Sequence, residues 1–94
     1  MYYLGHWEKS DDVSIKAFED KMKRFFTANN HHEAFAGTLL DFHAHAGEYK
    51  GIEVIEVRGK GSDKALVERM KLLEPELKIR WTPIINLRRQ LNIE

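Results

Sequence analysis

The stretch Gly51-Ile52-Glu53-Val54-Ile55-Glu56-Val57 decides the fold. Its β-branched residues and partial alternation of apolar and charged side chains predict a strand. Residues 47–51 have the composition of a turn, and residues from about 34 to 46 are expected to be extended. A β-hairpin is therefore predicted in the middle of the chain.

An aromatic strand and an amphipathic helix are predicted on the N-terminal side of this hairpin. The strand is Tyr2–Trp7, and Ser10, Asp11 or Asp12 could cap the helix that follows. Apolar residues then recur at helical spacing: Ile15, Phe18, Met22, Phe25 and Phe26. The helix is expected to end at Asn29-Asn30-His31-His32, because asparagine tolerates the left-handed backbone common at helix ends.

On the C-terminal side, a second helix and a last strand are predicted. Gly59-Lys60-Gly61 is interpreted as a turn, Ser62 or Asp63 as a helix cap, and Pro75 as the stop. The helix places three apolar residues on one stripe: Leu66, Met70 and Leu73. Residues 77–85 alternate with a period of two, which indicates a strand, and Pro83 favours an edge position. Residues 88–94 are expected to form a short helical turn or to fray.

The resulting order, β-α-β-β-α-β, is the split βαβ pattern of an α+β, ferredoxin-like sandwich. We expect a four-stranded antiparallel sheet with the first and third strands central and both helices on one face. At 94 residues, the chain is expected to be a single domain, 1–94. The other side of the sheet, called here the helix-free face, is left uncovered.

Composition narrows the function classes. Fifteen basic and fifteen acidic side chains balance, so neither nucleic acid nor an anionic membrane is an expected partner. There is no cysteine, which excludes thiolate catalysis and sulfur-based metal sites. Because Met1–Glu8 lacks the basic start and apolar stretch of a secretory signal, a cytoplasmic location is expected. No cofactor is expected.

The helix-free face is expected to mix apolar and ionisable groups. If Ala46 pairs with Gly51, Leu40 lies opposite Val57 and Phe42 opposite Ile55, beneath the helices. The same register sends these residues to the helix-free face: Leu39, Asp41, His43, His45, Ile52, Val54, Glu56 and Arg58, with Arg80 and Thr82 of the last strand. His6 is expected to join them, with Trp7 on the other side.

Such a face is expected to meet a partner. Two copies stacked face to face would bury its apolar members and enclose the polar ones around a space suited to a small molecule. The candidate ligand-binding or interface residues are His6, Asp41, His43, His45, Glu56, Arg58 and Arg80.

The element order, the Gly51–Val57 strand and the terminal Trp81-Thr82-Pro83-Ile84 strand resemble the dimeric α/β-barrel superfamily, especially its short uncharacterised members. The likeness covers nearly the whole chain but consists of apolar patterns. It implies a ferredoxin-like fold and a homodimer. Related proteins include cofactor-free monooxygenases, haem-degrading enzymes, isomerases and ligand-sensing domains, and no defined catalytic set carries over to this chain.

Alternative functions remain for the polar residues. Asp41, His43 and His45 are ligand types for a metal, and Glu56 could lie opposite Asp41, but a hydrogen-bonded dimer interface explains the same spacing, so no metal is expected. A cofactor-independent monooxygenase or isomerase would use His6, His43 or His45 for proton transfer. A structural subunit of a larger assembly is the third class. We expect ligand binding or assembly through the helix-free face, with catalysis undecided.

Overall fold

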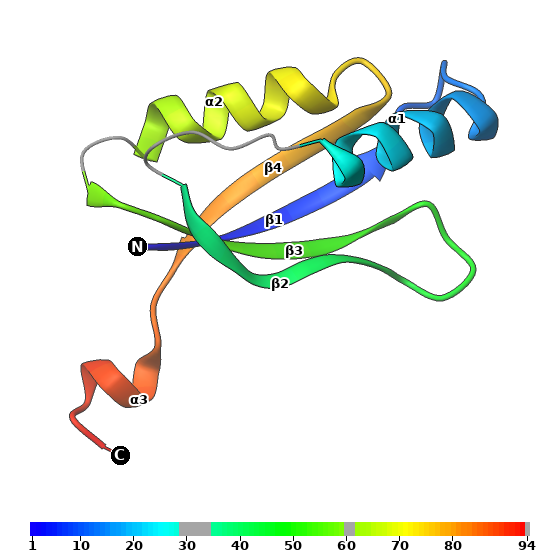
Figure 1. The fold of residues 1–94 in the computed structure, drawn as a ribbon. Helices are drawn as coiled ribbons and strands as arrows, with labels where there is room; N and C mark the ends of the chain where they lie inside the picture. Colours follow the sequence, from blue (N-terminus) through cyan, green and yellow to red (C-terminus); the bar gives the residue numbers. More distant parts are fainter. Residues whose placement is uncertain (29–34, 60–61, 94) are drawn as a thin grey trace.

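Four strands form one antiparallel sheet in the computed structural model, which describes residues 1–28, 35–59 and 62–93 (Figure 1). The strands are β1 (Tyr2–Lys9), β2 (Phe35–Ala44), β3 (Lys50–Val57) and β4 (Leu77–Ile84). Their order across the sheet is β2-β3-β1-β4. The α+β class and the central first and third strands are therefore confirmed, and β4, which contains Pro83, is an edge strand. The arrangement is compatible with a ferredoxin-like fold.

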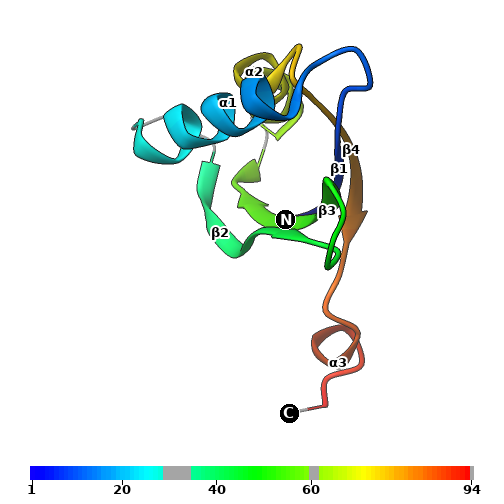
Figure 2. The same ribbon diagram turned by 90° about the vertical axis from the view of Figure 1, so that its right-hand side faces the viewer.

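Two helices, α1 (Ile15–Thr27) and α2 (Ser62–Leu73), cover the same face of this sheet, as both ribbon views show (Figures 1 and 2). A third, one-turn helix, α3 (Leu87–Gln90), follows β4 on an extension that leads away from α1 and α2. This short helix matches the helical turn predicted near the C-terminus. None of the helices within the described ranges combines the length and apolarity needed to cross a membrane.

Helix α1 begins at a different cap from the one predicted. The side chain of Ser14 accepts a hydrogen bond of 3.1 Å from the backbone N–H of Ala17. Ser10 cannot cap the helix because it is buried and its hydroxyl donates to the carbonyl of Pro75 at 2.6 Å. Asp11, the next candidate, is exposed in the turn that precedes the helix.

The predicted apolar stripe of α1 is correct in its centre and wrong at its edges. Phe18, Met22 and Phe25 are buried against the sheet, whereas Ile15 and Phe26 are 47% and 52% exposed. On α2 the predicted stripe is confirmed, since Leu66 and Leu73 are buried and Met70 is half-buried.

The core between helices and sheet contains two clusters of buried side chains. One gathers around Trp7 and α1: Trp7, Phe18, Met22, Phe25, Leu73, Leu77 and Ile79. The other lies beneath α2: Tyr3, Ile55, Val57, Ala65 and Leu66. Trp81 packs against both clusters. Its ring needs Gly5 beneath it, because a Cβ at residue 5 would lie 2.6 Å from the Trp81 ring.

The register of the central hairpin corrects the predicted pairing. Gly51 pairs with Ala44, not Ala46, and Val57 pairs with Phe35, not Leu40. Strand β2 also shifts register three times, between residues 35 and 37, 38 and 40, and 40 and 43. Each shift inserts an extra residue, so simple alternation along β2 fails.

Phe42 nevertheless faces the helices, as predicted. Its ring lies 5.9 Å from that of Trp7 and 5.8 Å from that of Phe25, between ring centroids. The residue opposite Ile55 is Thr38, not Phe42. Burial of the aromatic ring therefore accompanies the bulge that displaces its neighbours in the ladder. The predicted helix exit at Asn29–His32 and the Lys60-Gly61 part of the predicted turn lie outside the described residues.

Candidate functional site

The helix-free face is formed by the even-numbered residues of β1, β3 and β4. Along β1 as far as Glu8 and along β3, odd-numbered residues are buried beneath the helices, while even-numbered ones are half-buried or exposed. His6 is exposed and Trp7 is buried, which confirms the side predicted for each. The face contains Tyr2, Leu4, His6 and Glu8 of β1, Lys50, Ile52, Val54 and Glu56 of β3, and Lys78, Arg80, Thr82 and Ile84 of β4.

Cross-strand pairing arranges these side chains in rows that run from β2 to β4. One row contains His43, Ile52, His6 and Arg80. The next row contains Leu40, Val54, Leu4 and Thr82. The prediction that Leu40 lies beneath the helices is therefore wrong, because the bulges in β2 place it opposite Val54. An imidazole and a guanidinium therefore end one row, and aliphatic side chains fill most of the other. A row with several polar side chains therefore lies next to a row that is mostly aliphatic.

The apolar side chains in the middle of this face are only half-buried. This holds for Leu4, Leu40, Ile52 and Val54, in contrast to the fully buried Ile55 and Val57 on the other side of the same sheet. Within the part of the chain that the structure describes, both long helices lie on the opposite face (Figure 2). The half-buried aliphatic group is therefore open to a covering molecule.

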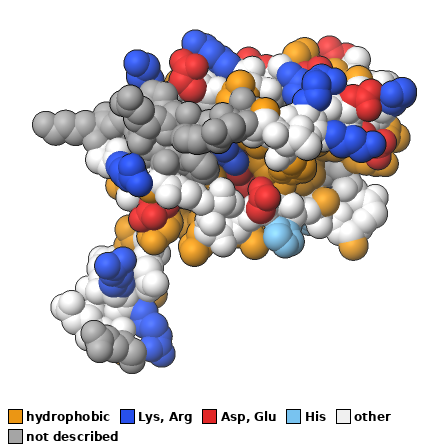
Figure 3. Space-filling view, in the orientation of Figure 1, with side chains coloured by type: hydrophobic (Ala, Val, Ile, Leu, Met, Phe, Trp, Pro, Cys, Tyr) orange, Lys and Arg blue, Asp and Glu red, His pale blue; other side chains and the backbone are white. Residues whose placement is uncertain are grey.

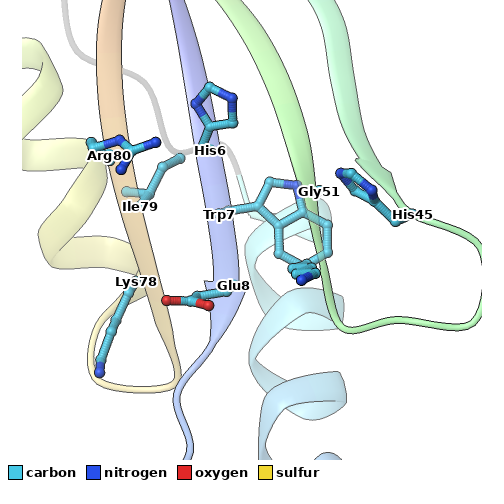
Figure 4. Close-up of a pocket in the computed structure, with 9 residues that line it drawn as sticks. His6, Trp7, Glu8, His45, Gly51, Lys78, Ile79 and Arg80 are labelled. Atoms are coloured by element: carbon cyan, nitrogen blue, oxygen red, sulfur yellow. The ribbon is translucent and has the colours of Figure 1, made fainter.

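A depression of ≈ 390 Å³ lies where β1 ends and β3 and β4 begin (Figure 4). Six ionisable side chains line it, and we call it the cationic depression: His6, Glu8, His45, Lys50, Lys78 and Arg80. In Figure 4 His6 and Arg80 lie on neighbouring strands, and His45 lies on the far side of β3. The backbone positions these groups, because His6 pairs with Arg80 and Glu8 pairs with Lys78.

The charges in the cationic depression do not balance. Lys50, Lys78 and Arg80 contribute three positive charges against the single carboxylate of Glu8. Lys50 has a further carboxylate nearby, since its Nζ lies 3.7 Å from Glu48 Oε2. Counting that carboxylate, one positive charge remains before any protonation of the histidines.

The structure brings together three of the seven candidate residues predicted from the sequence. His6, His45 and Arg80 line the cationic depression. His43 lies on the same face, opposite Ile52, but is not among the lining residues. Arg58 follows the end of β3 and is exposed. The three histidines proposed for proton transfer are therefore not gathered at one depression.

Asp41 and Glu56 do not face each other as predicted. Glu56 pairs with Gly37 and with Tyr2, towards the other end of the sheet. Asp41 lies in the irregular part of β2, where its carboxylate accepts a hydrogen bond of 2.8 Å from the backbone of Phe42. The extra residues in β2 are the physical reason, because each displaces the pairing that strict alternation assumes.

The alternative of a metal site requires Asp41, His43 and His45 to lie on one side of a regular strand, with Glu56 opposite Asp41. His43 Nδ1 lies 2.6 Å from the carbonyl oxygen of Asp41, so this imidazole makes a local backbone contact. In residues 1–28, 35–59 and 62–93, no three histidine, aspartate or glutamate side chains come close enough to hold a metal ion together.

Pattern analysis missed two groups of charged residues. Glu8, Lys50 and Lys78 line the cationic depression. The period of two places Lys78 with Arg80, but the first strand was predicted to end at Trp7, and it continues to Lys9, which brings Glu8 to the side of His6. Charged residues are common on protein surfaces, so the sequence did not single out these three as neighbours. They meet because separate strands end at the same edge.

The second missed group is a buried ion pair between the helices and the sheet. Glu53 of β3 is fully buried and Arg69 of α2 is 8% exposed. Arg69 donates to both carboxylate oxygens of Glu53, at 2.6 and 3.1 Å, and its guanidinium lies over the ring of Phe25. Burial raises the pKa of Glu53, and the hydrogen bonds and charge of Arg69 oppose that rise. The pair links α2 to the sheet.

No protein-family model matches this chain, and no curated protein is significantly similar to it in sequence. Function must therefore be argued from the arrangement of its own residues.

Proposed function

We propose that this chain is a small ligand-binding domain that works as a homodimer, joined through the helix-free faces in the manner of a dimeric α/β barrel. The observation that carries the proposal is the aliphatic group of Leu4, Leu40, Ile52 and Val54, half-buried in the single chain. A second copy would bury it on both sides. Each buried Leu, Ile or Val side chain would contribute about 1.5–3 kcal/mol if burial were complete.

Self-association fits the face because the face as a whole carries both acidic and basic groups. Glu8 and Glu56 provide acidic groups, and Lys78 and Arg80 provide basic ones. In a two-fold interface each residue is used twice, so acidic groups of one copy can meet basic groups of the other. The chain has no net charge that would oppose the pairing of two copies.

The C-terminal extension supports the same proposal. It leaves the body after β4 and carries several large apolar side chains that are more than half exposed: Ile85, Leu87, Leu91 and Ile93. Figure 3 shows the extension standing clear of the body, with apolar atoms at the junction and arginines along it. Its turn is nevertheless well formed, since Asn86 Oδ1 accepts from the N–H of Arg89 at 3.2 Å. A second copy would provide the contacts that an ordered apolar extension lacks in one chain.

The test is the oligomeric state of two matched variants, measured by sedimentation velocity at micromolar concentration. Val54→Asp places a charge in the centre of the proposed interface and should weaken self-association at least ~100-fold, because the charge is buried twice. Val67→Asp is the control, since Val67 is 47% exposed on α2, on the other side of the molecule. It should remain a dimer.

A monomeric wild-type protein at micromolar concentration would contradict the proposal. So would dimers in both variants, which would place the interface elsewhere. Circular dichroism of both variants separates loss of association from loss of folding. A cytoplasmic location remains an expectation from the sequence.

A further inference from the structure

The cationic depression contains one guanidinium that the chain leaves without a carboxylate directly across from it. Glu8 pairs across the ladder with both Lys50 and Lys78. Arg80 lies on an edge strand and has a single cross-strand neighbour, His6. Among the described residues, no carboxylate lies within ion-pair distance of Arg80, and Glu8 is only its diagonal neighbour.

An exposed arginine in such a place is suited to a planar anion. Its guanidinium stays charged at every physiological pH and donates two parallel hydrogen bonds to a carboxylate. His6 lies beside it with ring nitrogens that can donate or accept hydrogen bonds. Lys78 lies two residues before Arg80, on the same face of β4. These groups would hold one carboxylate at the edge of the sheet.

The neighbouring row defines the other end of the ligand. On β3, Ile52 lies next to His6. In the neighbouring row, Leu4 lies two residues before His6 and Val54 lies two residues after Ile52. Two residues of a strand span about 7 Å. That is the length of a six-membered ring with a carboxylate attached, so the ring would lie on aliphatic side chains while the carboxylate reaches Arg80.

Highly charged anions fit this depression less well. Glu8 lies among the cations and would repel a phosphate dianion or a nucleotide more strongly than a monoanion. The cationic depression, of ≈ 390 Å³, would hold only the carboxylate end, because Ile52, Leu4 and Val54 lie outside its lining. The charge of the depression therefore favours a monocarboxylate.

We propose that Arg80, assisted by Lys78 and His6, binds the carboxylate of a small amphipathic organic acid whose apolar part lies over Ile52, Leu4 and Val54. This inference rests on the proposed ligand-binding dimer only for the copy that covers the site, because all six contact residues belong to one chain. Covering the depression would remove water from its positive charges, so the bound carboxylate should also strengthen the dimer.

The test is a titration of ¹⁵N-labelled protein with benzoate at constant ionic strength, followed by amide chemical shifts. Benzamide has the same shape without the charge, and acetate has the charge without the ring. Benzoate should shift amides of residues 4–8, 50–54 and 78–82 and should bind at least ~10-fold more tightly than either control. Inorganic phosphate should bind more weakly than benzoate.

Two arginine variants make the test specific. Arg80→Gln should weaken benzoate binding at least ~10-fold, the usual cost of losing a charge-assisted hydrogen bond. Arg24→Gln removes the same charge from an exposed position on α1 and should leave binding within about twofold, since only general attraction is lost. Arg80→Lys keeps the charge without the planar fork and should give an intermediate affinity.

Binding that is equal for benzoate and benzamide, unchanged in Arg80→Gln, or matched by phosphate would overturn the inference. Sedimentation of the same samples keeps the two proposals apart. Benzoate binding by a monomer would support the site and contradict the dimer. A dimer without benzoate-dependent shifts would contradict the site alone.

Discussion

Two arginines that lie on opposite sides of the sheet have different surroundings. Beneath the helices, Arg69 donates to both oxygens of Glu53 and stacks on aromatic rings. On the helix-free face, Arg80 is exposed, and its one cross-strand neighbour among the described residues is His6. Beneath the helices, the buried charges are paired within the chain. On the helix-free face, charged side chains stay exposed and aliphatic side chains stay half-buried. A surface left in that condition is where a partner and a ligand are expected.

The largest predicted effect concerns the buried pair. Glu53→Gln should lower the free energy of unfolding by about 3–5 kcal/mol, because it removes the carboxylate that accepts two hydrogen bonds from the buried Arg69 guanidinium. Arg69→Met should cost a similar amount. The double variant Glu53→Gln with Arg69→Met should recover much of the loss, since no charge is then buried. Urea denaturation of all four proteins measures the coupling. Additive losses would show that the pair does not act as a unit.

The next effect sharpens the contrast in packing between the two faces. Gly5→Ala should cost about 1–3 kcal/mol, because the new methyl group would lie against the Trp81 ring and the chain must shift. Thr82→Ala is a suitable control, because Thr82 is exposed on the helix-free side of the neighbouring strand. It should change the free energy of unfolding by less than about 0.5 kcal/mol. Equal effects of the two changes would remove the packing argument.

A smaller effect depends on pH. Lys21 of α1 lies 3.1 Å from Glu76, next to the start of β4. Burial by itself would raise the pKa of Glu76, but the ammonium group of Lys21 beside it outweighs burial and holds the pKa below the ordinary value of 4.5. The folded chain therefore binds this proton less tightly than the unfolded chain, and the stabilisation is present above pH 4.5 and lost as pH falls through the lowered pKa.

Lys21→Gln should accordingly cost about 1 kcal/mol at neutral pH, and the cost should shrink in acid. Thermal unfolding at a series of pH values measures this change. A cost that stays constant with pH would assign the role of Lys21 to its hydrogen bonds with the carbonyls of Leu72 and Glu74 instead.

The smallest effect is expected at the arginine that matters most for the proposed ligand. Arg80→Gln should change the free energy of unfolding by no more than about 0.5 kcal/mol, because an exposed side chain with no ion pair in the described part of the chain stabilises little. Urea denaturation in the absence of organic acids measures it. A large loss would show that Arg80 is structural, like Arg69.

Sequence patterns predicted the sheet order and most of the core because these depend on regular periodicity. The alternation in residues 77–85 and the stripe containing Phe18 and Met22 needed no knowledge of distant residues. The register of β2 could not be predicted in this way. Its bulges accompany the burial of Phe42 among rings from β1 and α1, and those contacts are absent from any local pattern.

The candidate site was predicted in part for the same reason. His6 and Arg80 lie on regular strands, so their side of the sheet followed from alternation. Glu56 was placed opposite the wrong residue because that placement required the register of β2. The pairing of Glu53 with Arg69 joins a strand to a helix sixteen residues away, and neither residue stands out among charged neighbours. Glu53 and Arg69 are distinguished by their contact between a strand and a helix, which composition does not show.

The central claim is that a second copy covers the helix-free face, and methyl exposure in solution tests it most directly. Methyl-labelled wild-type protein would be measured by NMR with a soluble paramagnetic agent, which broadens signals from exposed groups. We predict that the methyls of Ile52 and Val54 are protected at micromolar concentration, while those of Val67, which is 47% exposed on α2, are broadened. Broadening of Ile52 and Val54 equal to that of Val67 would contradict the account.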